Sequence, residues 1–123
     1  MRVVIVDDQL SARSLCRRVL QDAADHLAID DFGDAEEALR WCMAHHPDVV
    51  VLDYRMPEMD GLRFLKRLIP ALQPRPAVVM MSTSDEPTLR QACLEAGAVA
   101  FIPKPLQPVE FRAQVLSLSL IHI

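Results

Sequence analysis

The stretch VVVLDYRMPEMDG, residues 49–61, constrains this chain more than any other part of the sequence. An uninterrupted run of Val and Leu is typical of a strand buried on both faces, as in a parallel sheet flanked by helices. The run ends at Asp53, so a carboxylate stands where this buried strand reaches the surface. Ligands and chemistry collect beyond the carboxyl ends of parallel strands. We therefore expect Asp53 to be a metal ligand, a nucleophile or a helix cap.

Strand-like and helix-like segments alternate along the chain. The strand-like segments are residues 2–6, 27–32, 47–54, 77–81 and 99–102. The helix-like segments are residues 11 to about 24, 34 to about 45, 60 to about 69, 86 to about 95 and 108 to about 118. Ser11 and Asp34 are the expected N-terminal caps of the first two helices, Asp60 and Gly61 lead the third, and Gly97 is the expected end of the fourth. Five alternating pairs predict an α/β fold, a doubly wound parallel sheet with five helices on both faces.

The order of the strands follows from their edges. Pro103 ends the fifth segment, and proline is tolerated at the edge of a sheet but not in the middle of a ladder. The second segment contains acids, which suits the other edge. The sequence thus predicts the flavodoxin-like order 2-1-3-4-5, with the ligand-binding switch point beside strands one and three.

Length and composition indicate a single domain. The chain has 123 residues, and we assign residues 1–118 to one domain. The end of the chain, LSLSLIHI, alternates with a period of two, which is wrong for a helix. We expect residues 119–123 to be a tail outside the domain: a frayed end, an artificial addition or the stump of a longer protein.

Charge and cysteine content exclude several classes of protein. A net charge of -4 without a long basic run disfavours nucleic-acid binding. No apolar run approaches the ~20 residues that span a bilayer, and acids come too early for a signal peptide. Three cysteines at unrelated spacings indicate reduced thiols in a cytoplasmic protein, not a disulfide framework or a zinc site.

Polar side chains with complementary chemistry follow the strands. Asp7 and Asp8 end the first strand, Asp53 the third and Ser82 the fourth, and Lys104 follows the fifth. Three converging carboxylates raise one another's pKa unless a cation offsets their charge, and Mg²⁺, or Mn²⁺ in its place, suits such a site. Carboxylates, a hydroxyl, an ammonium group and a metal ion match phosphoryl transfer, in which a carboxylate can be the nucleophile.

With these motifs the sequence resembles the receiver domain of two-component response regulators. The resemblance rests on VDD at 6–8, LDYRMPEMDG at 52–61, MMSTS at 80–84, EAGA at 95–98 and KP at 104–105. Each motif alone is weak, but all five in order at the family's spacing are highly specific, and they cover roughly residues 2–118.

The resemblance implies a role for each residue of the site. Asp53 is the phosphorylated residue, Asp8 a direct Mg²⁺ ligand, and Asp7 a ligand directly or through water. The backbone carbonyl of Arg55 completes the protein ligands of the metal. Lys104 pairs with the phosphoryl group.

The resemblance also implies a conformational switch. Ser82 stands at the family's Thr/Ser switch position, and Phe101 at the position of its rotating aromatic residue. The Lys104–Pro105 bond is expected to be cis. Thr83, at a position usually held by alanine, crowds the loop slightly, and Phe101 lacks the hydroxyl of a tyrosine. Neither departure removes a catalytic group.

The partners implied are a sensor histidine kinase or a phosphotransfer protein as donor, and a downstream protein target. The target is expected at the face made by the fourth helix, fifth strand and fifth helix, where a phosphorylation-dependent homodimer is a further candidate. The chain is then a signalling domain that promotes its own phosphorylation and dephosphorylation, not an enzyme. Arg13, Arg17 and Arg18 are expected on the solvated face of the first helix, which in the family is the usual docking surface for the kinase.

Three alternatives remain beside the phosphoacceptor switch. The first is a binding module without phosphorylation. Such a module need not retain all five polar site residues, whereas this chain does. A phosphohydrolase with an aspartyl nucleophile usually carries a second acid two residues after the nucleophile, where this chain has Arg55. A flavodoxin-type flavin carrier needs a Ser/Thr/Gly-rich phosphate loop after strand one, but DDQLSAR at residues 7–13 would repel phosphate unless a metal were bound.

Overall fold

The computed structural model describes residues 1–24, 26–84, 86–104 and 107–122. In this part of the chain a five-stranded parallel sheet has the order β2-β1-β3-β4-β5, so the predicted strand order is confirmed. The strands are β1 (Arg2–Val6), β2 (Ala28–Phe32), β3 (Val49–Asp53), β4 (Ala77–Ser82) and β5 (Ala98–Pro103). The helices are α1 (Leu10–Ala23), α2 (Ala35–His45), α3 (Gly61–Leu68), α4 (Pro87–Glu95) and α5 (Pro108–His122), with a 3-10 turn at Ile69–Ala71.

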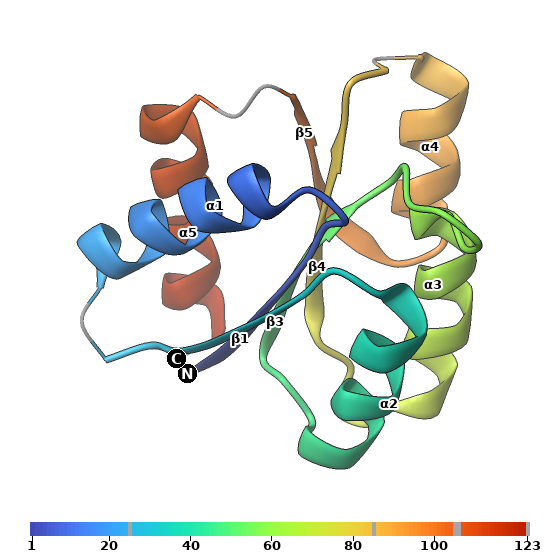
Figure 1. Cartoon of the computed structure of the whole chain (residues 1–123), viewed down its shortest axis with the longest axis horizontal. Coiled ribbons are helices and arrows are strands. Elements are labelled where there is room, and N and C mark those ends of the chain that lie inside the picture. Colours follow the sequence, from blue (N-terminus) through green and yellow to red (C-terminus); the bar gives the residue numbers. More distant parts are fainter. Residues whose placement is uncertain (25, 85, 105–106, 123) are drawn as a thin grey trace.

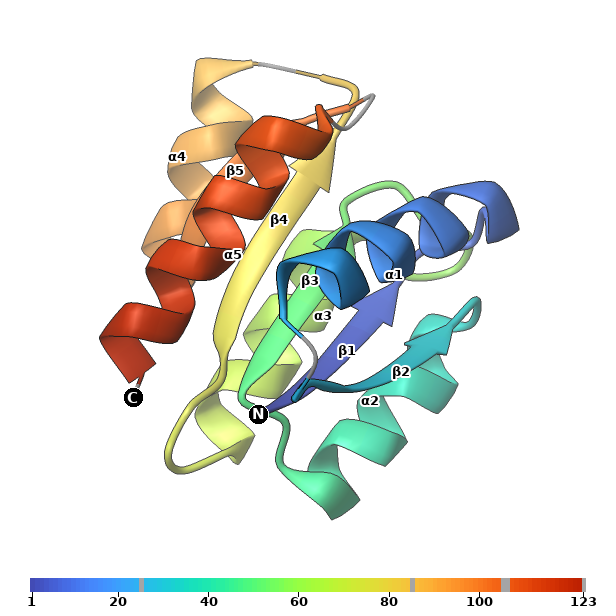
Figure 2. The ribbon, with the colours of Figure 1, turned by 90° about the vertical axis from the view of Figure 1, so that its left-hand side faces the viewer.

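Helices cover both faces of the sheet. Figure 1 shows α1 and α5 on one side and α2, α3 and α4 on the other. In Figure 2, α1 and α5 lie in front of the strands. The predicted doubly wound α/β architecture is therefore confirmed.

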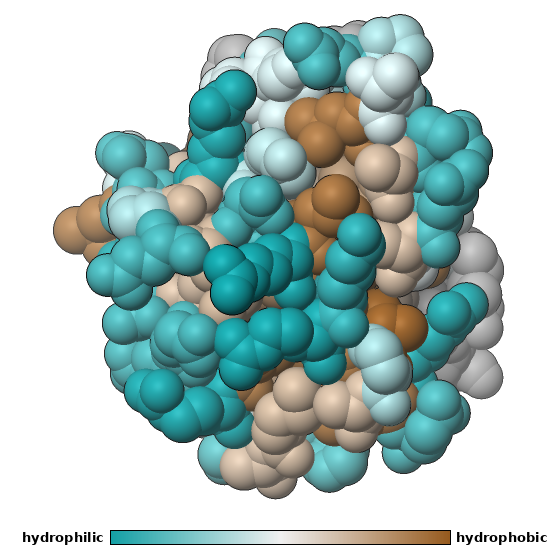
Figure 3. Space-filling view, turned by 90° about the vertical axis from the view of Figure 1, so that its right-hand side faces the viewer, coloured by the Kyte–Doolittle hydropathy of each residue, from teal (hydrophilic) through white to brown (hydrophobic). Residues whose placement is uncertain are grey.

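Successive side chains of a strand point to opposite faces of the sheet. Because helices cover both faces, the inner strands carry apolar side chains on both. The core under α2, α3 and α4 includes Val4, Val6, Val50, Leu52, Val78 and Met80. The core under α1 and α5 includes Val3, Ile5, Val49, Val51, Val79 and Met81. This is why residues 49–52 had to be a continuous apolar run. On the outer surface of α2, α3 and α4, Figure 3 shows apolar surface in separate areas between hydrophilic side chains.

The expected caps are only partly correct. The Asp34 carboxylate accepts hydrogen bonds from the backbone of Glu36 and Glu37, and the Asp60 carboxylate accepts one from Arg63. Gly97 follows the end of α4 with a φ of 117°, which favours glycine. The prediction for Ser11 is wrong, because α1 begins at Leu10 and has no side-chain cap.

At the end of the chain, α5 continues to His122, so the expectation that the two-residue alternation does not suit a helix is wrong. That residues 119–123 lie outside the domain stays a prediction. A two-residue alternation does not exclude a helix when the residues before it have already established one, since each further residue adds a backbone hydrogen bond at little entropic cost.

The three cysteines lie in the interior of the domain. Cys16, Cys42 and Cys93 are free thiols, and all three are buried. Burial raises the pKa of Cys16 and of Cys42 to about 12, so both remain protonated thiols. Among the described residues, no helix is both long and apolar enough to cross a membrane.

Candidate functional site

The carboxyl ends of four neighbouring strands bring the predicted polar residues together. Parallel register pairs Val6 with Leu52 and Asp53 with Met81, so β1, β3 and β4 end at nearly the same level. Ser82 is the last residue of β4 and pairs with the last residue of β5. Residues separated by up to about a hundred positions in the sequence thus meet at one rim.

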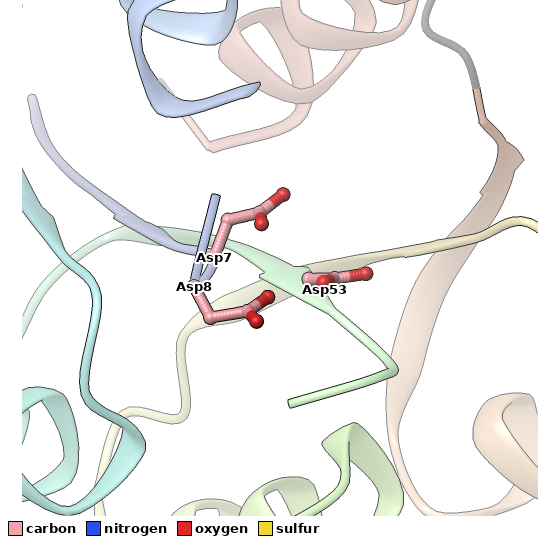
Figure 4. A group of neighbouring side chains, drawn as sticks. All are labelled: Asp7, Asp8 and Asp53. Atoms are coloured by element: carbon pink, nitrogen blue, oxygen red, sulfur yellow. The ribbon is translucent and has the colours of Figure 1, made fainter. Parts of the chain in front are cut away.

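Three carboxylates form the centre of this rim. One carboxylate oxygen each of Asp7, Asp8 and Asp53 lies within 4.8 Å of the others. Figure 4 shows the first two side chains leaving the end of β1 and the third leaving β3 into the same space. Asp7 is fully buried, Asp53 is 5% exposed, and Asp8 is intermediate. The predicted acidic cluster is therefore present.

Lys104 is the cation of the cluster. Its Nζ donates a hydrogen bond to Oδ2 of Asp7 at 2.6 Å and lies 3.4 Å from Oδ1 of Asp53. Its backbone N–H donates to the carbonyl of Ser82, which fixes the chain just after β5. Burial alone would lower the pKa of Lys104, but the hydrogen bond to Asp7 and the nearby carboxylates outweigh it and raise the pKa. Lys104 therefore stays charged.

The surroundings of Asp53 alter its protonation. Burial, and secondly the negative charge of Asp7, raise the pKa of Asp53 from 3.8 to about 6. Lys104 and a backbone hydrogen bond from Arg55 act in the opposite direction but do not cancel this rise. The group is thus mostly ionised at neutral pH, although its ionised form is held at a cost in free energy.

Ser82 and Phe101 are both buried near this rim. The Ser82 Oγ accepts a hydrogen bond from the backbone N–H of Ser84 at 3.0 Å. Phe101 is 7% exposed, and the Arg90 guanidinium lies 5.3 Å from the centre of its ring. The Lys104–Pro105 bond, predicted to be cis, involves a residue outside the described part of the chain.

The loop after β3 folds back tightly against the strand. The Gly61 N–H donates to the carbonyl of Tyr54 at 2.7 Å. A Cβ at Gly61 would lie 2.7 Å from the sulfur of Met80 and 2.8 Å from the Cα of Tyr54. The glycine of the MPEMDG motif is therefore needed for this close approach, which holds the Arg55 backbone beside Asp53.

These groups fit a divalent cation with oxygen ligands. Among the described residues, three carboxylates and one ammonium group meet here, which leaves two negative charges unbalanced in a largely buried site. Hard cations such as Mg²⁺ prefer carboxylate and carbonyl oxygens and tolerate retained waters.

The prediction for two arginines of α1 is wrong. Arg13 and Arg17 are not simply solvated, because both pair with Asp31 of β2. Arg13 also donates a hydrogen bond to the backbone carbonyl of Asp7. The one sequence signal that could have indicated this was the spacing of four residues between the arginines, together with an acid in the adjacent edge strand. Arg18 is exposed, as predicted.

Comparisons with known proteins agree on one family. The sequence matches the response regulator receiver domain over residues 3–116. The cyclic di-GMP phosphodiesterase response regulator RpfG of Xanthomonas campestris pv. campestris is 48% identical over 120 residues, covering 96% of this chain and 32% of that protein. A protein-glutamate methylesterase/protein-glutamine glutaminase of Burkholderia thailandensis is 41% identical, covering 86% of this chain and 30% of that protein.

A solved structure supports the same assignment. The chemotaxis protein CheY4 of Vibrio cholerae is 29% identical, with a TM-score of 0.81, and the match covers 94% of this chain and 95% of that one.

The chain belongs to the response regulator receiver domain family. It is a CheY-like signalling domain of the two-component type, and its site is consistent with a phosphoacceptor switch. The chain spans about a third of the length of the two curated relatives described above. The activities in their names belong to those whole proteins.

Proposed function

We propose that Asp53 accepts a phosphoryl group from a phosphohistidine of a sensor histidine kinase or a phosphotransfer protein. The observation that carries the proposal is the surroundings of Asp53. Its carboxylate lies at the end of the central strand, within reach of one cation, Lys104, and two further carboxylates. Such a site favours a ligand that arrives with a metal cation and brings acceptor oxygens to the ammonium group.

In this proposal the reaction depends on Mg²⁺, and the bonds that form and break join only the donor, the phosphoryl group and Asp53. An oxygen of Asp53 attacks phosphorus while the bond from phosphorus to the histidine nitrogen breaks, and the nitrogen keeps the electron pair. The product is an acyl phosphate on Asp53. Attack of water on phosphorus returns the carboxylate and releases inorganic phosphate. Lys104 offsets negative charge on the phosphoryl oxygens in both steps.

The metal ligands in this proposal are Asp8 and Asp53 directly, Asp7 directly or through water, and the backbone carbonyl of Arg55. Mg²⁺, or Mn²⁺ in its place, would offset the charge that gathers when a phosphoryl group approaches the carboxylates. Of the two aspartates after β1, Asp7 already accepts a hydrogen bond from Lys104, whereas Asp8 has no hydrogen bond or ion pair with another described residue. This difference favours Asp8 as the direct ligand.

The switch proposed for this domain links Ser82 to Phe101. A phosphoryl group adds acceptor oxygens and negative charge beside Ser82 and Lys104. The Ser82 hydroxyl can donate to it, which would draw the β4–α4 loop inward. Phe101 is already buried, and the Arg90 guanidinium lies against its ring. We infer that phosphorylation favours one packing of this ring and of α4 against β5, and that the output partner binds the α4–β5–α5 face.

The output partner is a downstream protein or an effector domain, in keeping with the curated relatives, which carry long segments beyond the part matched here. A second copy of the chain is the other candidate partner. We infer a cytoplasmic location, since three buried free thiols suit a reducing compartment.

The phosphoacceptor assignment is tested with Mg²⁺ and a small phosphodonor such as acetyl phosphate. We expect intact mass to rise by one phosphate that is labile to base, and Asp53→Ala to gain none. Asp48→Ala, which alters a carboxylate at the other end of β3, is the matched control and should label normally. Labelling of Asp53→Ala at a histidine or serine would refute the assignment.

The switch is tested by NMR of the Mg²⁺-bound protein with and without beryllium fluoride, a phosphoryl mimic. We expect chemical-shift changes to extend from residues 82–84 through Phe101 to α4. Ser82→Ala should reduce the distant changes more than those around Asp53. Changes confined to the surroundings of Asp53 would leave the α4–β5–α5 face without a role.

A further inference from the structure

Asp7 is held by four different partners. Its N–H donates to the carbonyl of Phe32 at 3.1 Å, and its Oδ1 accepts from the N–H of Gln9 at 2.9 Å. Its Oδ2 accepts from Lys104 at 2.6 Å. The fourth contact is the least expected: the Asp7 carbonyl accepts a hydrogen bond of 2.7 Å from Nη1 of Arg13. Each polar group of this residue therefore has a partner.

Arg13 is itself fixed in place. Its Nε donates to Oδ1 of Asp31 at 3.1 Å, and its side chain is 16% exposed. Asp31 lies opposite Ile5 in the β1–β2 register, on the face that α1 covers. A Cβ at Gly33 would come within 2.8 Å of the Arg13 Nη1, so the guanidinium occupies space that only glycine leaves free. This group joins α1, β2 and the end of β1.

Arg17 provides a natural comparison. It lies one helical turn after Arg13 and pairs with the same carboxylate, through Oδ2 of Asp31 at 2.7 Å. It also donates to the carbonyl of Ile29 at 3.1 Å. The two arginines thus tie α1 to β2 in similar ways, but in the part of the chain that the structure describes Arg13 hydrogen-bonds to Asp7 and Arg17 does not.

We propose that Arg13 is a positioning residue of the metal site, which holds the Asp7–Asp8 peptide in the orientation that aims both carboxylates at Asp53. This inference rests on the proposed function. The peptide group is planar, so a hydrogen bond that fixes the Asp7 carbonyl also fixes the amide of Asp8. Asp8 has few contacts of its own, and its direction depends on this peptide plane. Outer groups that orient the ligands of a metal contribute substantially to its affinity.

Charge and geometry make opposite predictions for Arg13. Loss of a positive charge near the site should strengthen the binding of a cation, by Coulomb's law. Loss of a group that orients the ligands should weaken it. The sign of the change in Mg²⁺ affinity therefore separates the two effects.

The experiment measures Mg²⁺ binding by isothermal titration calorimetry, with no phosphodonor present. We expect Arg13→Met to weaken Mg²⁺ binding about tenfold, the lower limit for outer-shell partners of metal ligands. Arg17→Met is the matched control, and we expect its affinity to be unchanged or slightly higher, although thermal stability falls in both variants. Arg13→Lys keeps the charge but loses the planar fork that reaches two acceptors, and it should remain weakened.

Gly33→Ala is a second variant, which retains Arg13, in case Arg13→Met does not fold. It displaces the guanidinium without altering any charge, and we expect weaker Mg²⁺ binding than in the wild type. As a readout that needs no metal, amide hydrogen exchange at Asp7 and Gln9, whose N–H groups donate to the Phe32 carbonyl and to the Asp7 carboxylate, should accelerate in Arg13→Met and Gly33→Ala but not in Arg17→Met.

Two results would overturn the inference while leaving the proposed function intact: Arg13→Met binding Mg²⁺ as tightly as the wild type or more tightly, or Arg17→Met weakening binding equally. A wild-type protein that binds no Mg²⁺ would instead overturn the proposed metal site, and the inference with it.

Discussion

The charged side chains at the two ends of the sheet differ in exposure and in sign. At the amino-terminal end, the Arg2 N–H donates to the Asp48 carboxylate at 2.7 Å, and the Arg2 guanidinium donates to the carbonyl of His45. The same guanidinium lies 5.6 Å from the centre of the Trp41 ring. These charged side chains are exposed and opposite in sign. At the carboxyl-terminal end, Asp7 and Asp53 are buried beside each other and share one cation, Lys104.

This difference separates a structural use of charge from a functional one. Exposed charged side chains that hydrogen-bond to the backbone cost little to place and contribute little, since water screens them. Buried carboxylates of like sign oppose folding unless a further cation arrives. The carboxyl-terminal end therefore carries charges that stabilise a ligand-bound state more than they stabilise the free domain. Four measurements, from the largest expected effect to the smallest, test this contrast.

The largest effect is expected for Lys104→Met. The substitution removes the ammonium group that pairs with the buried Asp7 and Asp53, and breaking a buried ion pair typically costs about 3–5 kcal/mol. Urea unfolding at pH 7 without Mg²⁺ should show this loss, and added Mg²⁺ should recover part of it. Lys66→Met, an exposed lysine on α3, is the control and should lie within about 0.5 kcal/mol of the wild type. A loss below about 1 kcal/mol for Lys104→Met would mean that the two carboxylates need no cation.

The second effect is a dependence of stability on pH. The pKa of Asp53 is about 6 in the folded protein, against 3.8 as the ordinary value, so the folded state binds this proton more tightly. The contribution of the protonated form is fully present below pH 3.8 and is lost as the pH rises through 6. At 1.36 kcal/mol per unit of pKa, the loss is at most about 3 kcal/mol.

Urea unfolding of the metal-free protein from pH 4 to 7 measures this window. We expect Asp53→Asn to remove the decline, so that the difference between the variant and the wild type grows as the pH rises. Parallel curves for the two proteins would contradict the raised pKa of Asp53.

The third effect is the change in stability when one aspartate is neutralised, and its sign should differ between the two ends of the sheet. Asp8→Asn removes one of three like charges, and we expect the metal-free domain to gain on the order of 1 kcal/mol, since Asp8 is only partly shielded from water. The same variant should bind Mg²⁺ more weakly. Asp48→Asn should instead lose a little stability, because the carboxylate accepts the Arg2 N–H. Thermal unfolding gives both signs, and a lower melting temperature for Asp8→Asn would identify Asp8 as mainly a structural residue.

The smallest effect is expected for Arg2→Met. It removes an exposed hydrogen bond and a contact with the Trp41 ring, together worth about 0.5 kcal/mol or slightly more. Thermal unfolding followed by Trp41 fluorescence measures the loss, and Mg²⁺ affinity should not change. A change in Mg²⁺ affinity would show that the two ends of the sheet are coupled.

Local sequence was sufficient to predict the sheet and the residues at its rim. A parallel strand buried on both faces must be a continuous apolar run, so β1, β3 and β4 could be located from their composition. Neighbouring parallel strands end at the same level, and the residues after those runs, such as Asp7 and Asp53, were therefore expected to meet. The helix caps at Asp34 and Asp60 were also predictable, because capping depends only on a few consecutive residues.

The tertiary structure decided which partner each charged side chain finds. Lys104 could have paired chiefly with Asp53, but the structure places it closest to Asp7. Arg13 and Arg17 were expected in solvent, but the packing of α1 against the edge of the sheet brings them to Asp31. Apolar burial follows a periodic pattern that local sequence records, whereas an ion pair depends on the direction of two long side chains from different elements. That direction is set only when the helices pack on the sheet.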